Sequence, residues 1–338
     1  MLNQIAINDF SSTPKYLQIV NSIIEGIEQN DILPGDKLPS IYEMCAHFEI
    51  SKRTVERAYE VLKEKELIGG VQGKGFYIQH TKFGRTQKIF LLFNKLSPHK
   101  KIIYDAFVER LGSDVAIDFF IYNNDFRLFK NLLLGHAHGY THYVIIPHFL
   151  DQSERAVDLI NQLPKHKLIV LDKAIDGLMG QYGSVVQNFE KDLTQALTDA
   201  LPLLRKYSTL NILFPAYSYY DKGILNGFYA FCHAYGFNAR VVHEVNDLVV
   251  QPDCAYINLM EEDLVTLIKK TKDTAYQVGK EVGILSYNES PLKEVLLDGI
   301  TVISTDHAHM GRTAADLILS DRHEHIENPF RLIVRRSL

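Results

Sequence analysis

Residues 33–62 read LPGDKLPSIYEMCAHFEISKRTVERAYEVL, and this stretch decides the fold of the N-terminal part of the chain. Its prolines and glycine predict that the preceding helix ends here. Ser40 and Glu43, which follow, stand at capping-box spacing. We therefore expect a short helix from about Ile41 and a second one capped by Ser51. Apolar residues at helical spacing predict one buried stripe on that second helix: Val55, Ala58, Tyr59 and Leu62. Two short helices joined by a tight turn are typical of a helix-turn-helix.

The flanking residues extend this arrangement on both sides. After Pro14, apolar residues at helical spacing predict a further amphipathic helix: Leu17, Val20, Ile24 and Ile27. After Leu67, the apolar runs 68–71 and 76–78 flank a glycine-bearing turn, which predicts a β-hairpin. We interpret this hairpin as the wing of a winged helix-turn-helix.

Three segments resemble a known family in their order and spacing. LPGDKLPS (33–40), ISKRTVERAYEVL (50–62) and the wing GKGFYI (73–78) resemble the DNA-binding domain of GntR-family bacterial regulators. The resemblance covers about residues 14 to 78. It implies that the chain binds double-stranded operator DNA.

The start of the predicted recognition helix carries side chains that suit DNA. Hydroxyls and helix N-terminal N–H groups hold phosphates, and guanidinium groups reach base edges in the major groove. The predicted DNA-binding residues are Ser40, Ser51, Lys52, Arg53, Thr54, Arg57 and the wing residue Lys74. Glu56 departs from the family, many of whose members carry a basic residue there. It either accepts a hydrogen bond from a cytosine amino group or pairs with Lys52 or Arg53, and we favour the ion pair.

Length and composition limit the alternatives. A chain of 338 residues predicts two domains, and its net charge of -5 means that DNA binding must come from a local basic patch. Cys45, Cys232 and Cys254 are too few and too scattered for a disulfide framework, so we expect reduced, buried thiols. The sequence shows neither a membrane span nor a secretory signal, which predicts a cytoplasmic protein without a membrane partner.

The pattern changes after a polar, glycine-containing segment. We predict a DNA-binding domain at 1–79, a linker at 80–87 and a larger domain at 88–338. In the larger domain, apolar runs of strand length alternate with helical stretches, which indicates a doubly wound α/β fold with a parallel sheet. Examples are KIFLLF (88–93), HYVIIP (142–147), KLIVLD (167–172) and TLNILF (209–214).

A second resemblance sharpens this prediction. VGILSYNESPLKEVLLDGITVISTDHAHMGRTAADLIL (282–319) resembles the end of the sugar-sensing domain of lactose-repressor-type regulators, which share the fold of periplasmic binding proteins. CAYINLMEEDL (254–264), YYDKGILNGFYAF (219–231) and KLIVLDKAI (167–175) match further segments. The resemblance implies two Rossmann-like lobes of the periplasmic-binding-protein type I kind, with a ligand cleft between them.

The same resemblance implies ligand-binding residues. Asp172, Asn258, Asn288 and His307 fall where that family places ligand-contacting groups. The family often has an arginine at the position of Ile224, whereas here the basic residue is Lys222, two positions earlier. Either Lys222 binds the ligand from another angle, or the site lacks this basic group and accepts a less polar ligand such as a deoxysugar. Because the chain has no tryptophan, stacking on a sugar would fall to a phenylalanine or to Tyr217, Tyr219 or Tyr220.

Other chemistries find little support. His136, His138, His142 and His148 invite a metal site, but their spacing does not bring them to one ion, and we predict no metal, no cofactor and no catalytic residue. An aminotransferase-like enzyme would need a longer chain. The sequence thus predicts a homodimeric regulator of a carbohydrate-utilisation operon with a small sugar as effector. The alternative is a DNA-binding protein whose C-terminal domain only dimerises or binds a non-sugar ligand, and the direction of regulation stays open.

Overall fold

The computed structural model describes residues 2, 5–8, 14–28, 31–71, 75–79, 87–113, 115–136, 139–150 and 153–338. The chain divides into two compact units, residues 1–86 and 87–338. The predicted wing residue Lys74 and residues 80–86 of the predicted linker lie outside the described residues.

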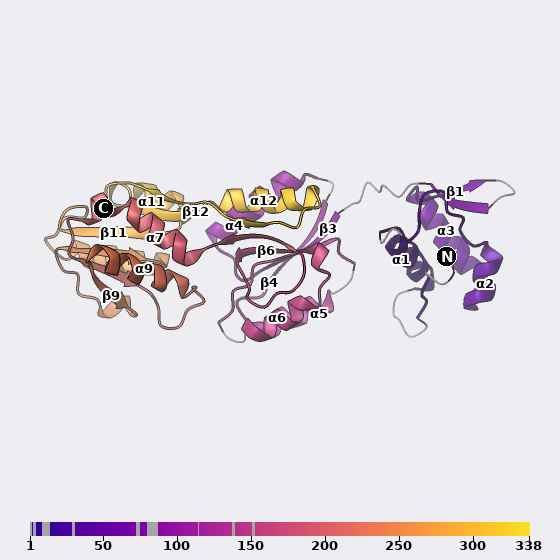
Figure 1. Ribbon diagram of the computed structural model, residues 1–338, viewed down its shortest axis with the longest axis horizontal. Coiled ribbons are helices and arrows are strands. Elements are labelled where there is room, and N and C mark those ends of the chain that lie inside the picture. Colours follow the sequence, from indigo (N-terminus) through magenta and orange to yellow (C-terminus); the bar gives the residue numbers. More distant parts are fainter. Residues whose placement is uncertain are drawn as a thin grey trace. The chain divides into compact units, whose positions relative to one another are not determined.

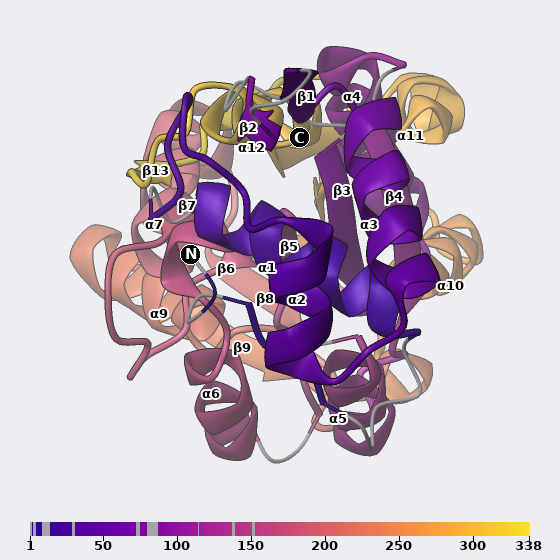
Figure 2. The same cartoon turned by 90° about the vertical axis from the view of Figure 1, so that its right-hand side faces the viewer.

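The N-terminal unit, drawn in indigo and violet in Figures 1 and 2, is a helical bundle followed by a hairpin. Its elements are α1 (Lys15–Glu28), α2 (Ile41–Phe48), α3 (Lys52–Glu64), β1 (Ile68–Val71) and β2 (Gly75–Ile78). The two strands pair antiparallel, with Ile68 opposite Ile78. The winged helix-turn-helix is therefore confirmed.

Serine caps begin α2 and α3 as predicted. The Glu43 N–H donates to the Ser40 hydroxyl at 3.2 Å, and the Ser40 N–H donates to the Glu43 carboxylate at 2.6 Å. The Thr54 N–H donates to the Ser51 hydroxyl at 3.2 Å. These bonds satisfy backbone donors that a helix start otherwise leaves unpaired, so both helices begin at defined residues.

The buried faces of the helices agree with the sequence for α3 and differ for α1. Val55, Ala58, Tyr59 and Leu62 of α3 are all buried. On α1 the buried residues are Ile19, Val20, Ile23 and Ile27, whereas Leu17 and Ile24 are only half-buried. Ile19, Ile23 and Ile27 stand four residues apart in one row along the helix, and this row packs into the core together with Val20, while Ile24 lies at its margin.

The C-terminal unit consists of two lobes, each built on a six-stranded sheet with helices on both faces (Figure 1). The sheet of the first lobe has the order β13-β7-β6-β5-β3-β4 and all its strand pairs are parallel. The elements of this lobe are β3 (Gln87–Phe93), α4 (Pro98–Leu111), β4 (Val115–Ile121), α5 (Phe126–Gly135), β5 (His142–Ile145), α6 (Ser153–Asn161), β6 (Leu168–Lys173), β7 (Gly183–Gln187), α12 (His307–Leu319) and β13 (His325–Glu327).

The sheet of the second lobe has the order β14-β12-β11-β10-β8-β9, with β14 antiparallel at its edge. Its elements are α7 (Phe189–Asp199), α8 (Leu201–Leu204), β8 (Thr209–Leu213), α9 (Gly223–Tyr235), β9 (Asn238–Val242), β10 (Cys254–Asn258), α10 (Glu261–Lys272), β11 (Val282–Tyr287), α11 (Pro291–Val295), β12 (Thr301–Thr305) and β14 (Phe330–Ile333). The predicted α/β architecture is confirmed.

Alternation along the central strands explains the helices on both faces. In β3, Ile89, Leu91 and Phe93 pack into the core beneath α4 and α12, whereas Phe90 and Leu92 pack into the core beneath α5 and α6. Successive side chains of a strand point to opposite faces, so a strand that is apolar at every position must be covered twice.

The chain passes between the lobes at three places, from β7 to α7, from β12 to α12 and from β13 to β14. Because the strands are parallel, their carboxyl ends and the loops that follow them gather at one edge of each sheet. The three connections join the lobes at these edges, so the loops of both lobes can contribute to one site.

Among the described residues, every helix is too short or too polar to cross a lipid bilayer. The three cysteines are free thiols. Cys232 and Cys254 are buried as expected, but Cys45 on α2 is only half-buried.

Candidate functional site

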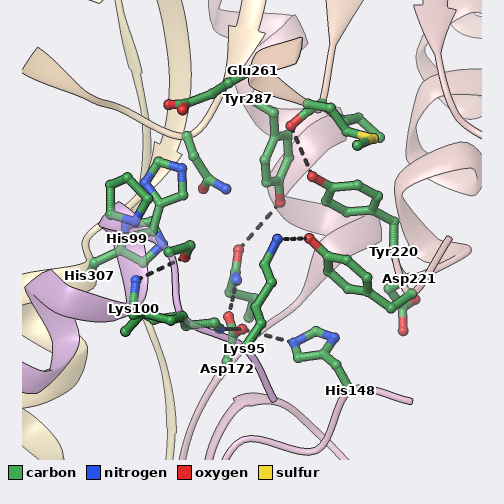
Figure 3. A pocket seen from close by; sticks show the side chains of 18 of the residues that line it. Lys95, His99, Lys100, His148, Asp172, Tyr220, Asp221, Glu261, Tyr287 and His307 are labelled. Carbon is green, nitrogen blue, oxygen red and sulfur yellow. Dashed lines mark hydrogen bonds and ion pairs between the residues drawn. The ribbon is translucent and has the colours of Figure 1, made fainter. Parts of the chain in front are cut away.

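A cavity of about 310 Å³ lies between the lobes of the C-terminal unit, at the carboxyl ends of their strands (Figure 3). The first lobe contributes the β3–α4 loop, the ends of β5, β6 and β7, and the start of α12. The second lobe contributes the loops after β8, β10 and β11. The lining residues are Lys95, Leu96, Ser97, Pro98, His99, Lys100, His148, Asp172, Gln187, Phe189, Tyr219, Tyr220, Asp221, Leu259, Met260, Glu261, Glu262, Tyr287, Asn288 and His307.

Asp172, at the end of β6, is the centre of a buried hydrogen-bonded cluster in this cavity. Lys100 and His148 both donate to its Oδ2 atom, His148 through Nε2 at 2.8 Å, and Gln187 donates to Oδ1. Both carboxylate oxygens therefore have partners from neighbouring elements. The side chains of Lys100, His148 and Asp172 are all less than a tenth exposed, at 9%, 6% and 7%.

Electrostatics keep this carboxylate ionised although it is buried. Burial alone raises the pKa of Asp172, but Lys100 and His148 together hold it well below its ordinary value. Burial lowers the pKa of His148, against the opposing effect of Asp172, so its imidazole is neutral at pH 7. Because the Nε2 atom of His148 donates to Asp172, its Nδ1 atom carries the lone pair. Nδ1 is buried and has no hydrogen-bond partner within the described residues.

Two stacked imidazoles form another side of the cavity. The rings of His99 on α4 and His307 at the start of α12 lie 5.2 Å apart with 17° between their planes. Burial lowers the pKa of His307 to about 3, and burial together with the Lys293 ammonium lowers the pKa of His99 to about 4. Both rings are therefore neutral at pH 7 and able to exchange hydrogen bonds with an uncharged ligand.

We predict that these two histidines make the C-terminal unit less stable at pH 5 than at pH 7. Below about pH 6.5 both histidines bind protons in the unfolded chain but stay neutral in the folded one. Each therefore lowers the free energy of unfolding by up to about 2 kcal/mol at pH 5. The lowered pKa of His148 acts in the same direction in this window, whereas burial raises the pKa of Asp192 to about 6 and so offsets part of the loss; the lowered pKa of Asp172 has its effect only at lower pH. Urea unfolding at both pH values measures the difference.

A His99→Gln/His307→Gln double variant should lose less stability between pH 7 and 5 than the unchanged chain. His233→Gln, at an exposed position of α9, is the control and should change nothing. Equal pH dependence in the double variant and the unchanged chain would show that these rings are not the source.

The second lobe supplies a further acceptor at Asn288, which follows β11. This residue has a φ of 63°, in the left-handed region that asparagine tolerates. The buried Lys293 ammonium donates to the carbonyl oxygens of Asn288 and Tyr287 at 2.7 and 3.0 Å and so holds the loop. Burial lowers the pKa of Lys293 to about 8. The Asn288 Oδ1 atom is buried without a hydrogen-bond partner among the described residues.

Contacts across the cleft hold the lobes close together. Lys95 of the first lobe donates to the Tyr219 hydroxyl of the second, and its ammonium lies 4.5 Å from the centre of the Tyr219 ring. The Tyr287 hydroxyl donates to the Gln187 Oε1 atom at 3.3 Å. Such contacts must rearrange whenever the lobes move apart.

The structure brings together three of the five residues predicted to bind ligand. Asp172, Asn288 and His307 line one cavity. Asn258 does not, because its Nδ2 atom turns back to donate to the Met260 carbonyl at 3.0 Å, while Leu259 and Met260 form the wall. Lys222, at the start of α9, lines a separate cavity beside the first. Two of the three tyrosines considered for stacking, Tyr219 and Tyr220, line the first cavity, and Tyr217 is 79% exposed.

Sequence reasoning missed Lys95, His99, Lys100, His148 and Gln187. Lys100 gave a weak signal, as a lysine in line with the apolar residues that form the buried face of α4. Lys95 and His148 lie in loops, His99 in the first turn of α4 and Gln187 at the end of β7, and only the convergence of the strand ends shows that they meet.

His136 and His148, two of the histidines considered for a metal site, each make a different contact. His148 binds Asp172, and the His136 Nδ1 atom lies 2.8 Å from the Leu132 carbonyl oxygen at the end of α5. His138 lies outside the described residues. In the described part of the chain, no three histidine, cysteine or acidic side chains are placed to hold a metal ion.

The candidate DNA-binding surface lies at the start of α3 in the N-terminal unit. Ser51, Lys52 and Arg53 are exposed there and Thr54 is half-buried. Glu56 pairs with Lys52 at 3.2 Å, as favoured from the sequence. Ser40, at the start of α2, is also exposed, and its hydroxyl keeps its hydrogen free to donate to a phosphate.

The arginines of α3 have different surroundings. Arg57 pairs with Glu60 at 3.2 Å and approaches Glu64 at 3.8 Å, whereas Arg53 forms no ion pair within the described residues. Tyr42 in the first turn of α2, which the sequence did not single out, is 76% exposed and near enough to Lys52 to contribute to the raised pKa of that ammonium, after the larger effect of Glu56.

Comparison with known proteins agrees with the N-terminal unit. Residues 15–78 match the family "Bacterial regulatory proteins, gntR family". The uncharacterized HTH-type transcriptional regulator YydK of Bacillus subtilis is 38% identical over 81 residues, which cover 24% of this chain and 34% of YydK. The mannosyl-D-glycerate transport/metabolism system repressor MngR of Escherichia coli is 35% identical over 66 residues, 20% of this chain and 28% of MngR. Each match spans about a third of the relative or less.

The C-terminal unit is similar in structure to another group of regulators. A LacI family transcriptional regulator from Enterococcus faecalis, solved with bound ribose, superposes with a TM-score of 0.58 at 17% identity over 74% of this chain and 98% of that one. At this identity the likeness shows the fold. The chain thus joins a gntR-type helix-turn-helix domain to a two-lobed domain with the fold of LacI-type regulators.

Proposed function

We propose that this protein is a ligand-responsive DNA-binding transcription regulator that controls carbohydrate use, with a sugar as its effector. The observation that carries the proposal is the cavity at the strand ends of both lobes, in the same chain as a gntR-type helix-turn-helix domain. The residues that we assign to contact the ligand are His148, Asn288, His99 and His307. Asp172 holds His148 and Lys100 in place.

The hydrogen-bonding groups of the cavity suit a polyhydroxylated, uncharged ligand. Unpaired buried acceptors on His148 and Asn288 would each take a hydrogen from a ligand hydroxyl. Tyr219 and Tyr220 stack on one another, with ring centres 4.9 Å apart, and offer an aromatic wall for a sugar ring. Sugar-related names among similar proteins, the repressor MngR and the ribose-bound regulator, support the same ligand class.

The regulatory step we propose is a change in the relative position of the lobes. A ligand that contacts both lobes favours the closed arrangement, and two chains in a homodimer would transmit this change to two DNA-binding domains on a pseudo-palindromic operator in the cytoplasm.

We predict that Asn288→Gly abolishes stabilisation by the effector. Glycine accepts the positive φ of this position, so the variant removes the amide with its unpaired Oδ1 atom without straining the loop. A saturating sugar at about 100 times its dissociation constant should stabilise the unchanged chain by about 2.7 kcal/mol and the variant by far less. Thermal unfolding of the full chain with a panel of monosaccharides and disaccharides measures this.

Asn123→Gly is the matched control, because Asn123 also has a positive φ, of 49°, but lies in an exposed loop outside the cavity. It should respond to the sugar like the unchanged chain. An Asn288→Gly variant that responds equally well would remove Asn288 from the site. A folded chain that no sugar stabilises would favour a non-sugar ligand or a domain that only dimerises.

For DNA binding we predict that Arg53→Ala weakens operator affinity by about 1–3 kcal/mol. Arg57→Ala should cost less, because Arg57 must first leave Glu60 and Glu64. Binding to duplexes selected from a random pool by the unchanged chain measures both. Lys272→Ala, on α10 of the C-terminal unit, removes one positive charge as a control. Equal affinities for Arg53→Ala and Lys272→Ala would place Arg53 outside the interface.

A further inference from the structure

We propose, resting on the sugar-sensing function above, that the effector has two units: one sits in the cavity just described and a second, uncharged unit sits in an adjoining cavity. The effector is then a disaccharide or a glycoside rather than a free monosaccharide. The cavity around Asp172 is only one part of the space between the lobes.

The second cavity has a volume of about 1180 Å³, compared with about 310 Å³ for the first. The smaller volume is at the lower end of the range for small-molecule pockets, about 300–1,000 Å³. It suits one sugar ring, and a larger ligand bound there would have to extend outward. The second cavity lies beside α6, the end of β6 and the start of α9, where Lys222 stands.

The two cavities are neighbouring compartments of one cleft, since Gln187, Phe189 and Asp221 line both. Gln187 also donates to Asp172, so one side chain joins the buried cluster of the first compartment to the wall of the second. The Phe189 ring lies at the boundary, where an aromatic face can pack against the apolar face of a sugar. A ligand that bridges the compartments would contact all three shared residues.

The boundary also carries an ion pair between the lobes. Lys173 from β6 lies 2.8 Å from Asp221, and the two side chains remain 33% and 26% exposed. Both side chains keep part of their surface open to the cavities that they line, so ligand hydroxyls can compete for their hydrogen bonds. Asp221 is held in place by the Gly223 N–H, which donates to it at 2.8 Å.

The charges of the second compartment favour an uncharged unit. Its cations are Lys173, already paired with Asp221, and Lys222. Its other carboxylates are Glu154, Asp176 and Glu190, together with Glu327, which is paired with Lys191 at 2.6 Å. This excess of negative charge would repel a phosphate or a carboxylate on the ligand. The Asn226 Oδ1 atom remains as an acceptor for a ligand hydroxyl, while its Nδ2 atom donates to Glu190 at 3.3 Å.

Ala174→Trp tests the proposal, because Ala174 is exposed, lines the second compartment and does not line the first. The indole would fill the second compartment. Ala230→Trp, on an exposed part of α9 that lines neither cavity, is the matched control. The chain has no tryptophan of its own, so each variant also carries a single fluorescent reporter.

Calorimetry on the full chain would use cellobiose, maltose, trehalose, sucrose, lactose and melibiose, their constituent monosaccharides, and sucrose 6-phosphate. We expect one uncharged disaccharide to bind at least about tenfold more tightly than its monosaccharides. Ala174→Trp should raise the dissociation constant of that disaccharide about tenfold or more and leave monosaccharide affinities unchanged. Ala230→Trp should change neither.

A monosaccharide that binds as tightly as any disaccharide would overturn the two-unit proposal and leave the sugar-sensing function standing. Unchanged disaccharide affinity in Ala174→Trp would overturn it in the same way, and tighter binding of sucrose 6-phosphate than of sucrose would overturn the uncharged second unit. A panel in which no sugar binds would overturn both the inference and the function on which it rests.

Discussion

Replacing Asp172 by alanine should lower the unfolding free energy of the C-terminal unit by about 3–5 kcal/mol, because it leaves the buried Lys100 ammonium without its partner. The same change removes the hydrogen bond that fixes His148 in the tautomer with a free Nδ1 atom. Effector binding should therefore be lost as well. Urea unfolding of the full chain measures the first effect, and sugar-induced stabilisation measures the second.

A double variant separates the two effects. Asp172→Asn combined with Lys100→Met removes both charges, so most of the stability should return while the ligand response stays lost. Glu324→Ala is the control, because its pair with Arg322 is about half exposed and should contribute less than about 1 kcal/mol. A loss of stability in Asp172→Ala no larger than this control would contradict the buried charge cluster.

Gly311→Ala should destabilise the first lobe by about 1–3 kcal/mol, because α12 packs against α4 (Figure 1) and Gly311 touches the α4 backbone. A Cβ atom there would lie 2.3 Å from the Ile103 carbonyl oxygen and 3.0 Å from the Phe107 nitrogen, both backbone atoms that cannot turn aside. Forcing the helices apart would also separate His99, on α4, from His307 at the start of α12. We therefore expect weaker effector binding in addition to the lower midpoint of urea unfolding.

Gly135→Ala, at the end of α5, is the matched control for this substitution. A Cβ atom at Gly135 meets no atom within 4 Å, so that variant should be neutral or slightly more stable. A Gly311→Ala variant with the stability of Gly135→Ala would show that the two helices are farther apart than in the structure.

The elements with strong local signals were predictable from the sequence. Ser40 and Ser51 cap helices because their neighbours supply the matching groups, and the α3 stripe from Val55 to Leu62 follows from its period. The central strands were visible because they are apolar at nearly every position. The face of α1 was less predictable, since apolar residues occupy two adjacent rows and only the packed core decides how deeply each one is buried.

The site was predictable only in part. Asp172, Asn288 and His307 follow strands at positions that the family resemblance marks, and they meet in one cavity. Asn258 follows the same rule, yet its amide bonds to its own loop. Lys100 and Gln187 escaped notice because their importance comes from the buried carboxylate that both contact, which involves three elements far apart in sequence.

The most direct test of the central claim is operator affinity of the full chain with and without a sugar that stabilises it. We predict that a saturating sugar changes the operator dissociation constant by about fivefold or more, and that operator DNA changes the sugar affinity by the same factor. Operator affinity that stays the same with and without the bound sugar would contradict the proposed coupling between the two units.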